Sequence, residues 1–400
     1  MNGPRPGRVD ASLVDRVRRR LTDAAAPPTA VAVIDAVRAE PRHAPLGGTT
    51  LLRLGDRIYD EIAGAGPLGP LLADPTVTDV VVNGPAEVWI DRGGGMERAA
   101  VAFADATSLR RLAQRLAAAC ERRLDDASPY VDAHLPDGTR LHAVLPPVAV
   151  RGPYLSLRTF RHRAFALDEL AAAGTLDGDA VQLVRAVVQA RLAYLVSGGT
   201  GSGKTTLLAT LLGLVPPRER IVIVEDATEL RPAHPHVVTL QSRLSNVEGV
   251  GAVSLRDLVR QALRMRPDRL VIGECRGEEV MDLLGALNTG HEGGAGTLHA
   301  NTAADVPARL EALGLLGGLS REALHAQVAA GLQLVLHVAR TTAGRALDEI
   351  CLLTPGGPAR LVQAVTAWRR GTGPGPAATA LARLLTARGV VPPAALGGSR

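Results

Sequence analysis

The chain has 400 residues, 46% of them hydrophobic, enough for one large or two medium domains. A net charge of +5 with only 2% aromatic residues argues against a protein that stacks single-stranded nucleic acid on aromatic side chains. The three cysteines, Cys120, Cys275 and Cys351, are far apart and form no CxxC pair. A zinc module or a disulfide framework is therefore excluded as the basis of the fold.

The N-terminus predicts no export signal, because charged residues follow residues 1–8 and no apolar core is present. No apolar run reaches the ~18 residues that a membrane span needs. Even residues 180–196 are interrupted by Arg185 and Arg191. We therefore expect a cytoplasmic protein without a transmembrane segment.

The first part of the chain predicts a variable helical segment, residues 1–45, and an α+β domain, residues 46–160. Apolar periodicity predicts the helices, and runs of β-branched residues ending at turns predict the strands. The expected elements are helices at 11–24, 30–40 and 108–124, and strands at 78–84, 87–91, 141–145 and 154–160.

After a linker at 161–175, strands and helices alternate through residues 176–355. Such alternation is typical of a parallel sheet with helices on both faces. Ser254 and Asp257 form a capping-box start for one helix, which ends before Pro267. The expected strands are 192–196, 221–224 and 270–272. A Pro/Gly/Ala-rich tail follows at 356–400, with one helix near 377–388.

The segment from Gly198 to Thr205 matches the pattern GxxxxGK[ST] at every fixed position and lies between an expected strand and helix. This is the P-loop, whose backbone N–H groups wrap phosphates at a helix N-terminus. Its lysine reaches the β- and γ-phosphates, and its threonine binds Mg²⁺. The predicted ATP-binding residues are Gly198, Gly199, Thr200, Gly201, Ser202, Gly203, Lys204, Thr205 and Thr206.

Lys204 is the only lysine among the 45 basic residues of the chain. The bias toward Ala, Gly, Pro and Arg indicates a GC-rich genome, which favours arginine wherever either residue serves. A compact ammonium fits among phosphate oxygens where a planar guanidinium does not. The surviving lysine therefore supports a phosphate-binding role for this loop.

A P-loop needs a carboxylate at the end of a nearby strand. Glu225 and Asp226 follow the apolar run 221–224, and Glu274 follows 270–273. Ligands bind at the carboxyl ends of strands in open α/β sheets. We expect one of these acids to polarise the attacking water and another to help hold Mg²⁺. Asp226 or Glu274 would otherwise cap the helix that follows.

Two histidines, His291 and His299, lie in a polar, glycine-rich stretch between apolar elements. Taken alone, this stretch favours an exposed loop over a functional site.

The order of these motifs resembles the type II/type IV secretion ATPase family. An Asp box, a Walker B motif and a His box follow the P-loop, in residues 224–226, 264–277 and 289–301. Four N-terminal motifs resemble the CpaF/TadA branch, whose members drive Flp/Tad pilus assembly or accompany conjugal-transfer genes. They lie in residues 79–85, 128–133, 135–140 and 155–158. The resemblance spans Leu51 to Cys351.

This resemblance implies a RecA-like P-loop ATPase domain preceded by a smaller α+β domain. It assigns catalysis to Glu274, with Glu225 and Asp226 assisting at Mg²⁺ and water. His299 would contact the γ-phosphate, with His291 nearby, and Arg276 would link subunits or sites.

From the N-terminal domain, Arg140 and Arg158 would close over the nucleotide; the alternative is that they form surface ion pairs. The family also implies a homo-hexamer at the inner face of the cytoplasmic membrane, driving a membrane-embedded platform protein. The chain departs from the branch at His134 and Thr159, where arginine is usual.

Two other functions stay open. A conjugation ATPase would transport DNA, although the scarcity of aromatic residues argues against direct nucleic-acid binding. A nucleotide-gated scaffold would bind ATP without hydrolysing it.

Overall fold

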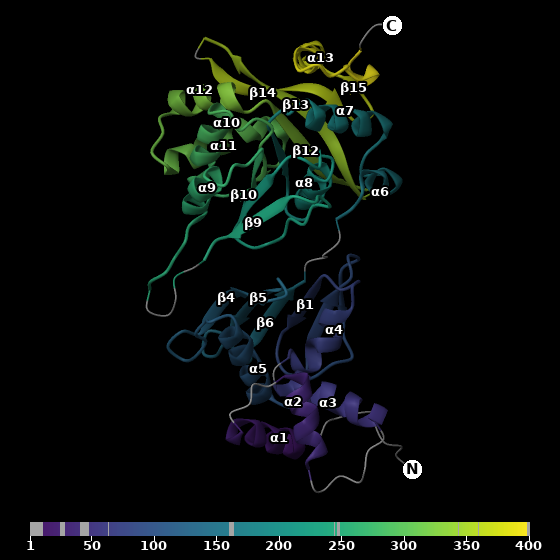
Figure 1. Ribbon diagram of the computed structural model, residues 1–400, viewed down its shortest axis with the longest axis vertical. Helices are drawn as coiled ribbons and strands as arrows, with labels where there is room; N and C mark the ends of the chain where they lie inside the picture. The colour runs from purple at the N-terminus through teal and green to yellow at the C-terminus, as the bar shows by residue number, and fades with distance from the viewer. Residues whose placement is uncertain are drawn as a thin grey trace. The chain divides into compact units, whose positions relative to one another are not determined.

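A computed structural model describes residues 11–24, 29–40, 48–62, 64–159, 164–243, 245, 249–342, 344–358 and 360–397. The chain divides into two compact units, Met1–Arg161 and His162–Arg400 (Figure 1). Expectations that fall on residues 1–10, 41–47 and 160–163 lie outside the described residues.

The first unit begins with helices that pack around a small apolar cluster of their own, including Val17, Val33 and Ile58. The hydroxyl of Thr29 caps the second helix by accepting the N–H of Ala32 at 3.2 Å. The two helices expected from the sequence are present, and a third follows them. They are α1 (Ala11–Asp23), α2 (Ala30–Arg38) and α3 (Gly48–Ile62).

An antiparallel sheet forms the rest of the first unit, in the order β3-β2-β1-β6-β5-β4. Alternate residues of its strands are buried, and Leu109 and Leu112 of helix α5 belong to the same core. The elements are η1 (Gly66–Leu68), α4 (Gly69–Ala73), β1 (Asp79–Val82), β2 (Val88–Asp91), β3 (Met96–Arg98), α5 (Ala106–Ala119), β4 (Tyr130–His134), β5 (Arg140–Val144) and β6 (Tyr154–Arg158).

The second unit is built on a sheet in the order β15-β14-β13-β12-β7-β11-β10-β8-β9. Strands from β12 to β9 in that order pair in parallel, and β13 to β15 extend the sheet antiparallel. The strands are β7 (Tyr194–Gly198), β8 (Ile221–Glu225), β9 (Val237–Gln241), β10 (Arg269–Cys275), β11 (Ala295–His299), β12 (Leu334–Thr341), β13 (Gly344–Gly356), β14 (Leu361–Arg369) and β15 (Gly373–Pro374).

Helices cover both faces of this sheet, because central parallel strands are apolar on both sides (Figure 1). Helices α7, α8 and α13 share one core with the sheet, and α9 to α12 share the other. The helices are α6 (Leu167–Ala172), α7 (Gly178–Gln189), α8 (Lys204–Leu212), α9 (Leu255–Leu263), α10 (Glu279–Asn288), η2 (Ala303–Asp305), α11 (Val306–Leu316), α12 (Arg321–Gly331), α13 (Ala378–Ala387) and η3 (Ala394–Leu396).

The C-terminal part differs from the expected tail. Strand β14 pairs with β13 along its length, and Trp368 is fully buried in the core. The segment after residue 355 therefore belongs to the sheet, and the expected helix near 377–388 is present as α13. The expected capping box is also present, because Ser254 and Asp257 bond to each other's backbone N–H at the start of α9.

Candidate nucleotide-binding and catalytic site

The P-loop leaves the sheet at the end of the fully buried strand β7 and leads into α8. Gly198 has φ +152°, and a Cβ atom there would overlap the carbonyl oxygen of Val338 on β12. Gly203 has φ +101° and directly precedes the helix. Both positions require glycine, since residues with a side chain rarely adopt such backbone conformations. The loop is thus shaped to bring backbone N–H groups around an anion.

Lys204 is buried in this loop, with 7% of its surface exposed. Its Nζ donates to the carbonyl oxygens of Gly198 at 3.1 Å and Gly199 at 2.9 Å. Burial lowers the pKa of the ammonium, and the charge of Glu274 works against that effect. The lysine is therefore held at the loop by two backbone carbonyl groups of the loop itself.

Glu274, near the end of β10, is connected to Lys204 through His299, which contacts both residues. Its Oε2 accepts from Arg276 at 2.7 Å, and its Oε1 lies 3.0 Å from Nε2 of His299. Burial opposes ionisation, but Arg276, His299 and Lys204 together hold the pKa of this carboxyl below its usual value. Glu274 is therefore ionised at neutral pH.

His299, the last residue of β11, links the two. Its Nδ1 lies 3.4 Å from Nζ of Lys204, and its Nε2 faces Glu274. An ammonium can only donate, so Nδ1 is an acceptor and Nε2 carries the proton that is donated to Glu274. Burial, with the charge of Lys204, lowers the pKa of His299, which favours this neutral form. Lys204, His299 and Glu274 thus form one hydrogen-bonded line.

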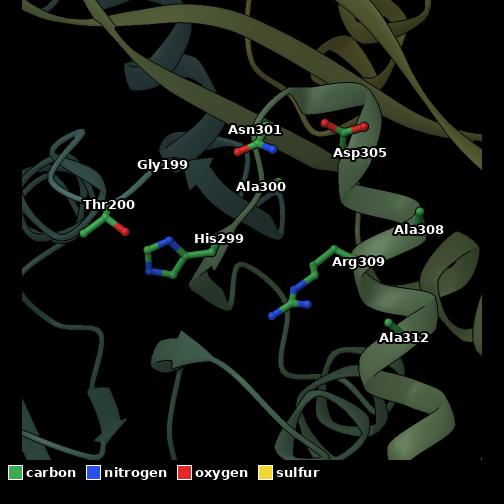
Figure 2. Close-up of a pocket in the computed structure, with 9 residues that line it drawn as sticks. All are labelled: Gly199, Thr200, His299, Ala300, Asn301, Asp305, Ala308, Arg309 and Ala312. Carbon is green, nitrogen blue, oxygen red and sulfur yellow. The ribbon is translucent and has the colours of Figure 1, made fainter.

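A pocket of about 560 Å³ opens beside this line. In Figure 2 the imidazole of His299 lies between Thr200 of the P-loop and helix α11, from which Arg309 extends into the pocket. Asn301 and Asp305 line the same space. The pocket therefore joins the P-loop to the stretch after β11, at the carboxyl edge of the sheet, where α/β folds bind ligands.

Glu225 has a different environment from Glu274. It is 3% exposed, and its Oε1 accepts the N–H groups of Glu229 at 3.2 Å and Leu230 at 3.0 Å. Its Oε2 is buried without a hydrogen-bond partner among the described residues. Burial raises the pKa of this carboxyl to about 8. In this structure Glu225 supports the loop after β8 instead of reaching Lys204.

Asp226 and Arg276 are exposed residues that follow Glu225 and Glu274 closely in the sequence. Asp226 is exposed and accepts from the hydroxyl of Ser242 at 2.9 Å. Arg276 bonds to Glu274, and that bond, with smaller contributions from Asp226 and Glu229, raises the pKa of its guanidinium. His291 lies apart from the line, with Nδ1 3.3 Å from the carbonyl oxygen of Ala286 at the end of α10.

Arg140 and Arg158 belong to the first unit, on neighbouring strands and directly opposite each other. Arg140 pairs with Asp132 at 2.7 Å, and Arg158 lies 4.0 Å from Asp79. Both arginines form exposed ion pairs, which is the alternative that the sequence left open. Directly after β6, the strand that carries Arg158, the hydroxyl of Thr159 donates to the carbonyl oxygen of Val77 at 2.6 Å.

Two buried groups were missed by the sequence analysis. Glu279 accepts the N–H groups of Arg276 at 2.6 Å and Gly277 at 2.8 Å, and so fixes the turn that carries Arg276. The hydroxyl of Ser197, just before the P-loop, lies 2.9 Å from Nδ1 of buried His337 on β12. The two acids directly after Walker B, Glu278 and Glu279, could have pointed to Glu279 as a functional residue, but no local sequence pattern points to His337.

The residues present fit a nucleotide with Mg²⁺. Among the described residues, no group of three or more His, Cys, Asp or Glu side chains is placed to hold a metal. Mg²⁺ in phosphate sites does not need such a cage, because it keeps waters and binds phosphates and one or two carboxylates. The hydroxyl of Ser202 is buried without a partner among the described residues, as is Oε2 of Glu225. Thr205, in the first turn of α8, is partly exposed.

Comparison with known proteins identifies the family. The model of the type II/IV secretion system protein family matches residues 61–363, well over half of the chain. The chain belongs to this family.

Its relatives include a putative conjugal transfer protein of Mycobacterium tuberculosis, 57% identical over 86% of this chain and 99% of the relative. The conjugal transfer protein TrbB of Rhizobium radiobacter is 30% identical over 74% of this chain and 88% of that one.

A solved structure of the pilus retraction motor PilT with bound ADP supports the fold. It covers 73% of this chain and 83% of its own, with 22% identity and a TM-score of 0.52. Within the described part of the chain, no helix is long and apolar enough to cross a membrane.

Proposed function

We propose that this family member is an ATP hydrolase whose RecA-like second unit converts hydrolysis into movement for a type II/IV secretion or Flp/Tad pilus system. The observation that carries the proposal is the hydrogen-bonded line from Lys204 through His299 to Glu274. It joins the residue that binds phosphate to an ionised carboxylate at the carboxyl edge of the sheet.

Each residue of the line has a role that follows from its chemistry. Lys204 leaves the carbonyl groups of its own loop and binds the β- and γ-phosphate oxygens. Glu274, ionised because its pKa is lowered, accepts a proton from the water that attacks the γ-phosphorus as the bond to the β-phosphate oxygen breaks. His299 donates its Nε2–H to Glu274 and so orients the carboxylate. Because His299 also contacts Lys204, it responds to γ-phosphate bound by that lysine.

Mg²⁺ bound at Thr205 and Asp226, with Glu225 supporting the loop behind them, would neutralise charge on the β- and γ-phosphates. Arg276, already at Glu274, would add positive charge at the same end, from this chain or toward a neighbouring copy. Arg140 and Arg158 would reach the nucleotide by exchanging the carboxylates of Asp132 and Asp79 for phosphate.

Assembly into a homo-hexamer, peripheral attachment at the inner face of the cytoplasmic membrane and a platform-protein partner complete the proposal. These three features rest on the family resemblance and not on the geometry of the site.

A conjugal transfer role is the second candidate, because relatives named as conjugal transfer proteins align over most of the chain. A DNA-transport motor would bind DNA with a strong salt dependence and hydrolyse ATP faster in its presence. Unchanged hydrolysis with DNA at low salt would leave the secretion or pilus role.

Phosphate release by the purified full chain with ATP and Mg²⁺ tests the proposed function. Lys204→Arg keeps the charge but not the compact shape, so we expect hydrolysis to fall by roughly 100-fold or more. Arg383→Gln, at an exposed position on α13, serves as the control. ATP binding without phosphate release by the unaltered chain would instead support the scaffold alternative.

A further inference from the structure

The hairpin of β12 and β13 lies on the side of β7 opposite to the catalytic carboxylate. Strand β7 is flanked by β11 on one side and β12 on the other. His299 and Glu274 lie on the β11 and β10 side. On the other side, Arg340 of β12 and Arg345 of β13 are directly opposite each other in the antiparallel register. We refer to these two residues as the hairpin arginine pair.

The P-loop touches this hairpin at both of its ends. A Cβ atom at Gly198 would overlap the carbonyl oxygen of Val338, one strand across. A Cβ atom at Gly203 would lie 3.4 Å from Cδ of Arg345. The stem of Arg345 therefore passes beside the residue that immediately precedes Lys204. The guanidinium at the end of this stem can therefore reach a group that is bound at the phosphate-binding loop.

In the described part of the chain, the hairpin arginine pair forms no ion pair with an acidic side chain. Both side chains are exposed, and among the described residues neither guanidinium has an ion pair or a hydrogen bond. Like charges directly opposite in an antiparallel pair repel and destabilise the sheet. A second arginine pair with this geometry, Arg140 and Arg158, has the carboxylates of Asp132 and Asp79 beside it. An anion that binds the hairpin arginine pair would remove the repulsion.

The different residues on the two sides of β7 determine which way the triphosphate of a bound nucleotide runs across the P-loop. The γ-phosphate must lie near Glu274 and His299, because the attacking water is activated there. The β-phosphate lies over the loop at Lys204. The α-phosphate is at the opposite end of the triphosphate chain from the γ-phosphate, so we place it on the other side of the loop, toward β12 and β13.

We propose that Arg340 and Arg345 bind the α-phosphate of the nucleotide and so set the affinity for ATP and ADP alike. This proposal rests on the proposed function and specifies the nucleoside end of the same site. Guanidinium groups are suited to the role, because each offers a planar set of donors to phosphate oxygens. Neither residue lies at the scissile bond, so the pair affects binding more than the chemical step.

The test measures the affinity of the full chain for a fluorescent ATP analogue, a fluorescent ADP analogue and inorganic pyrophosphate. In the double variant Arg340→Gln/Arg345→Gln we expect ATP and ADP to bind about 10- to 100-fold more weakly, by the same factor. The turnover number at saturating ATP should change much less. Pyrophosphate, which needs only the loop, should lose less affinity than ADP.

The controls separate binding from folding and charge. The nucleotide-free double variant should unfold at the same temperature as the unaltered chain or above it, since the repulsion is gone. Arg383→Gln removes one exposed positive charge elsewhere in the second unit and should leave both affinities unchanged. The variant Arg340→Lys/Arg345→Lys, which keeps both charges, should retain more ADP affinity than the glutamine variant.

Three outcomes would overturn the proposal. Equal ADP affinity in the unaltered chain and the glutamine variant would show that the pair does not bind nucleotide. A loss for ATP without a loss for ADP would place the pair at the γ-phosphate. A change in assembly state with unchanged affinities would make it an interface between copies. If the unaltered chain bound no nucleotide, the proposed function itself would fail.

Discussion

Glu225 and Glu274 lie at or near the ends of neighbouring strands and look alike in the sequence, but the fold gives them opposite electrostatic environments. Glu225 is buried, bonded to the backbone and has a pKa raised to about 8. Glu274 is partly exposed and is kept ionised mainly by Arg276. A pair of acids whose pKa values are pushed apart is a common way to divide roles in an active site. Here the ionised acid suits proton transfer and the buried one suits loop support.

The cause of the difference is the neighbouring strand. Val224 pairs with Ile272, so Glu225 lies level with Gly273. Gly273 has no side chain, and a Cβ atom there would lie 2.5 Å from Cγ of Glu225. The glycine makes the space into which Glu225 is buried. Glu274, one residue further along, extends past this space to Arg276 and His299.

Replacing Glu225 by glutamine gives the largest expected effect on stability. The pKa of Glu225 is about 8 in the fold against 4.5 as a free side chain. The neutral carboxyl therefore contributes to the free energy of unfolding. This contribution is fully present below pH 4.5 and is lost as the pH rises through 8. Glu225→Gln cannot ionise and escapes this loss. At about pH 8 the variant should be more stable than the unaltered chain, by an amount on the order of a few kcal/mol.

Urea unfolding of both proteins across this pH range, without nucleotide, measures the effect. Other titrating groups are common to both chains and cancel in the difference between them. A difference that stays constant with pH would contradict the raised pKa and the contrast with Glu274.

A methyl group at Gly273 tests the space between the two acids and should have a smaller effect. Gly273→Ala would press on buried Glu225 and should cost about 1–3 kcal/mol in unfolding free energy. Gly285→Ala is the matched control, because Gly285 lies within α10 and a Cβ there meets nothing within 4 Å. That control should stabilise the chain by about 0.5–1 kcal/mol. Equal effects of the two changes in thermal unfolding would refute the steric account.

The P-loop, the strand before it and the position of Glu274 were predictable from the sequence, because each depends on a short local pattern. The capping box at Ser254 was predictable for the same reason. Strands β12 to β14 were not predicted, although Leu334–Leu336 is an apolar run and the pairing of these strands extends the sheet.

The environments of individual site residues were beyond the sequence. Burial of Glu225 depends on a glycine in another strand, and the bond between Ser197 and His337 joins residues 140 apart. The approach of Arg345 to Gly203 likewise arises only when β13 is placed next to β12. The family resemblance pointed to Arg140 and Arg158 but gave no signal for the hairpin arginine pair.

The most direct test of the account is steady-state phosphate release by Glu274→Gln, with ATP binding measured on the same protein. Glutamine keeps the size of the side chain and an acceptor for Arg276, but it cannot take the proton of the attacking water. The account predicts that the variant binds ATP as the unaltered chain does and releases phosphate at least about 100-fold more slowly. Turnover close to that of the unaltered chain would contradict the assignment of Glu274 as the catalytic base.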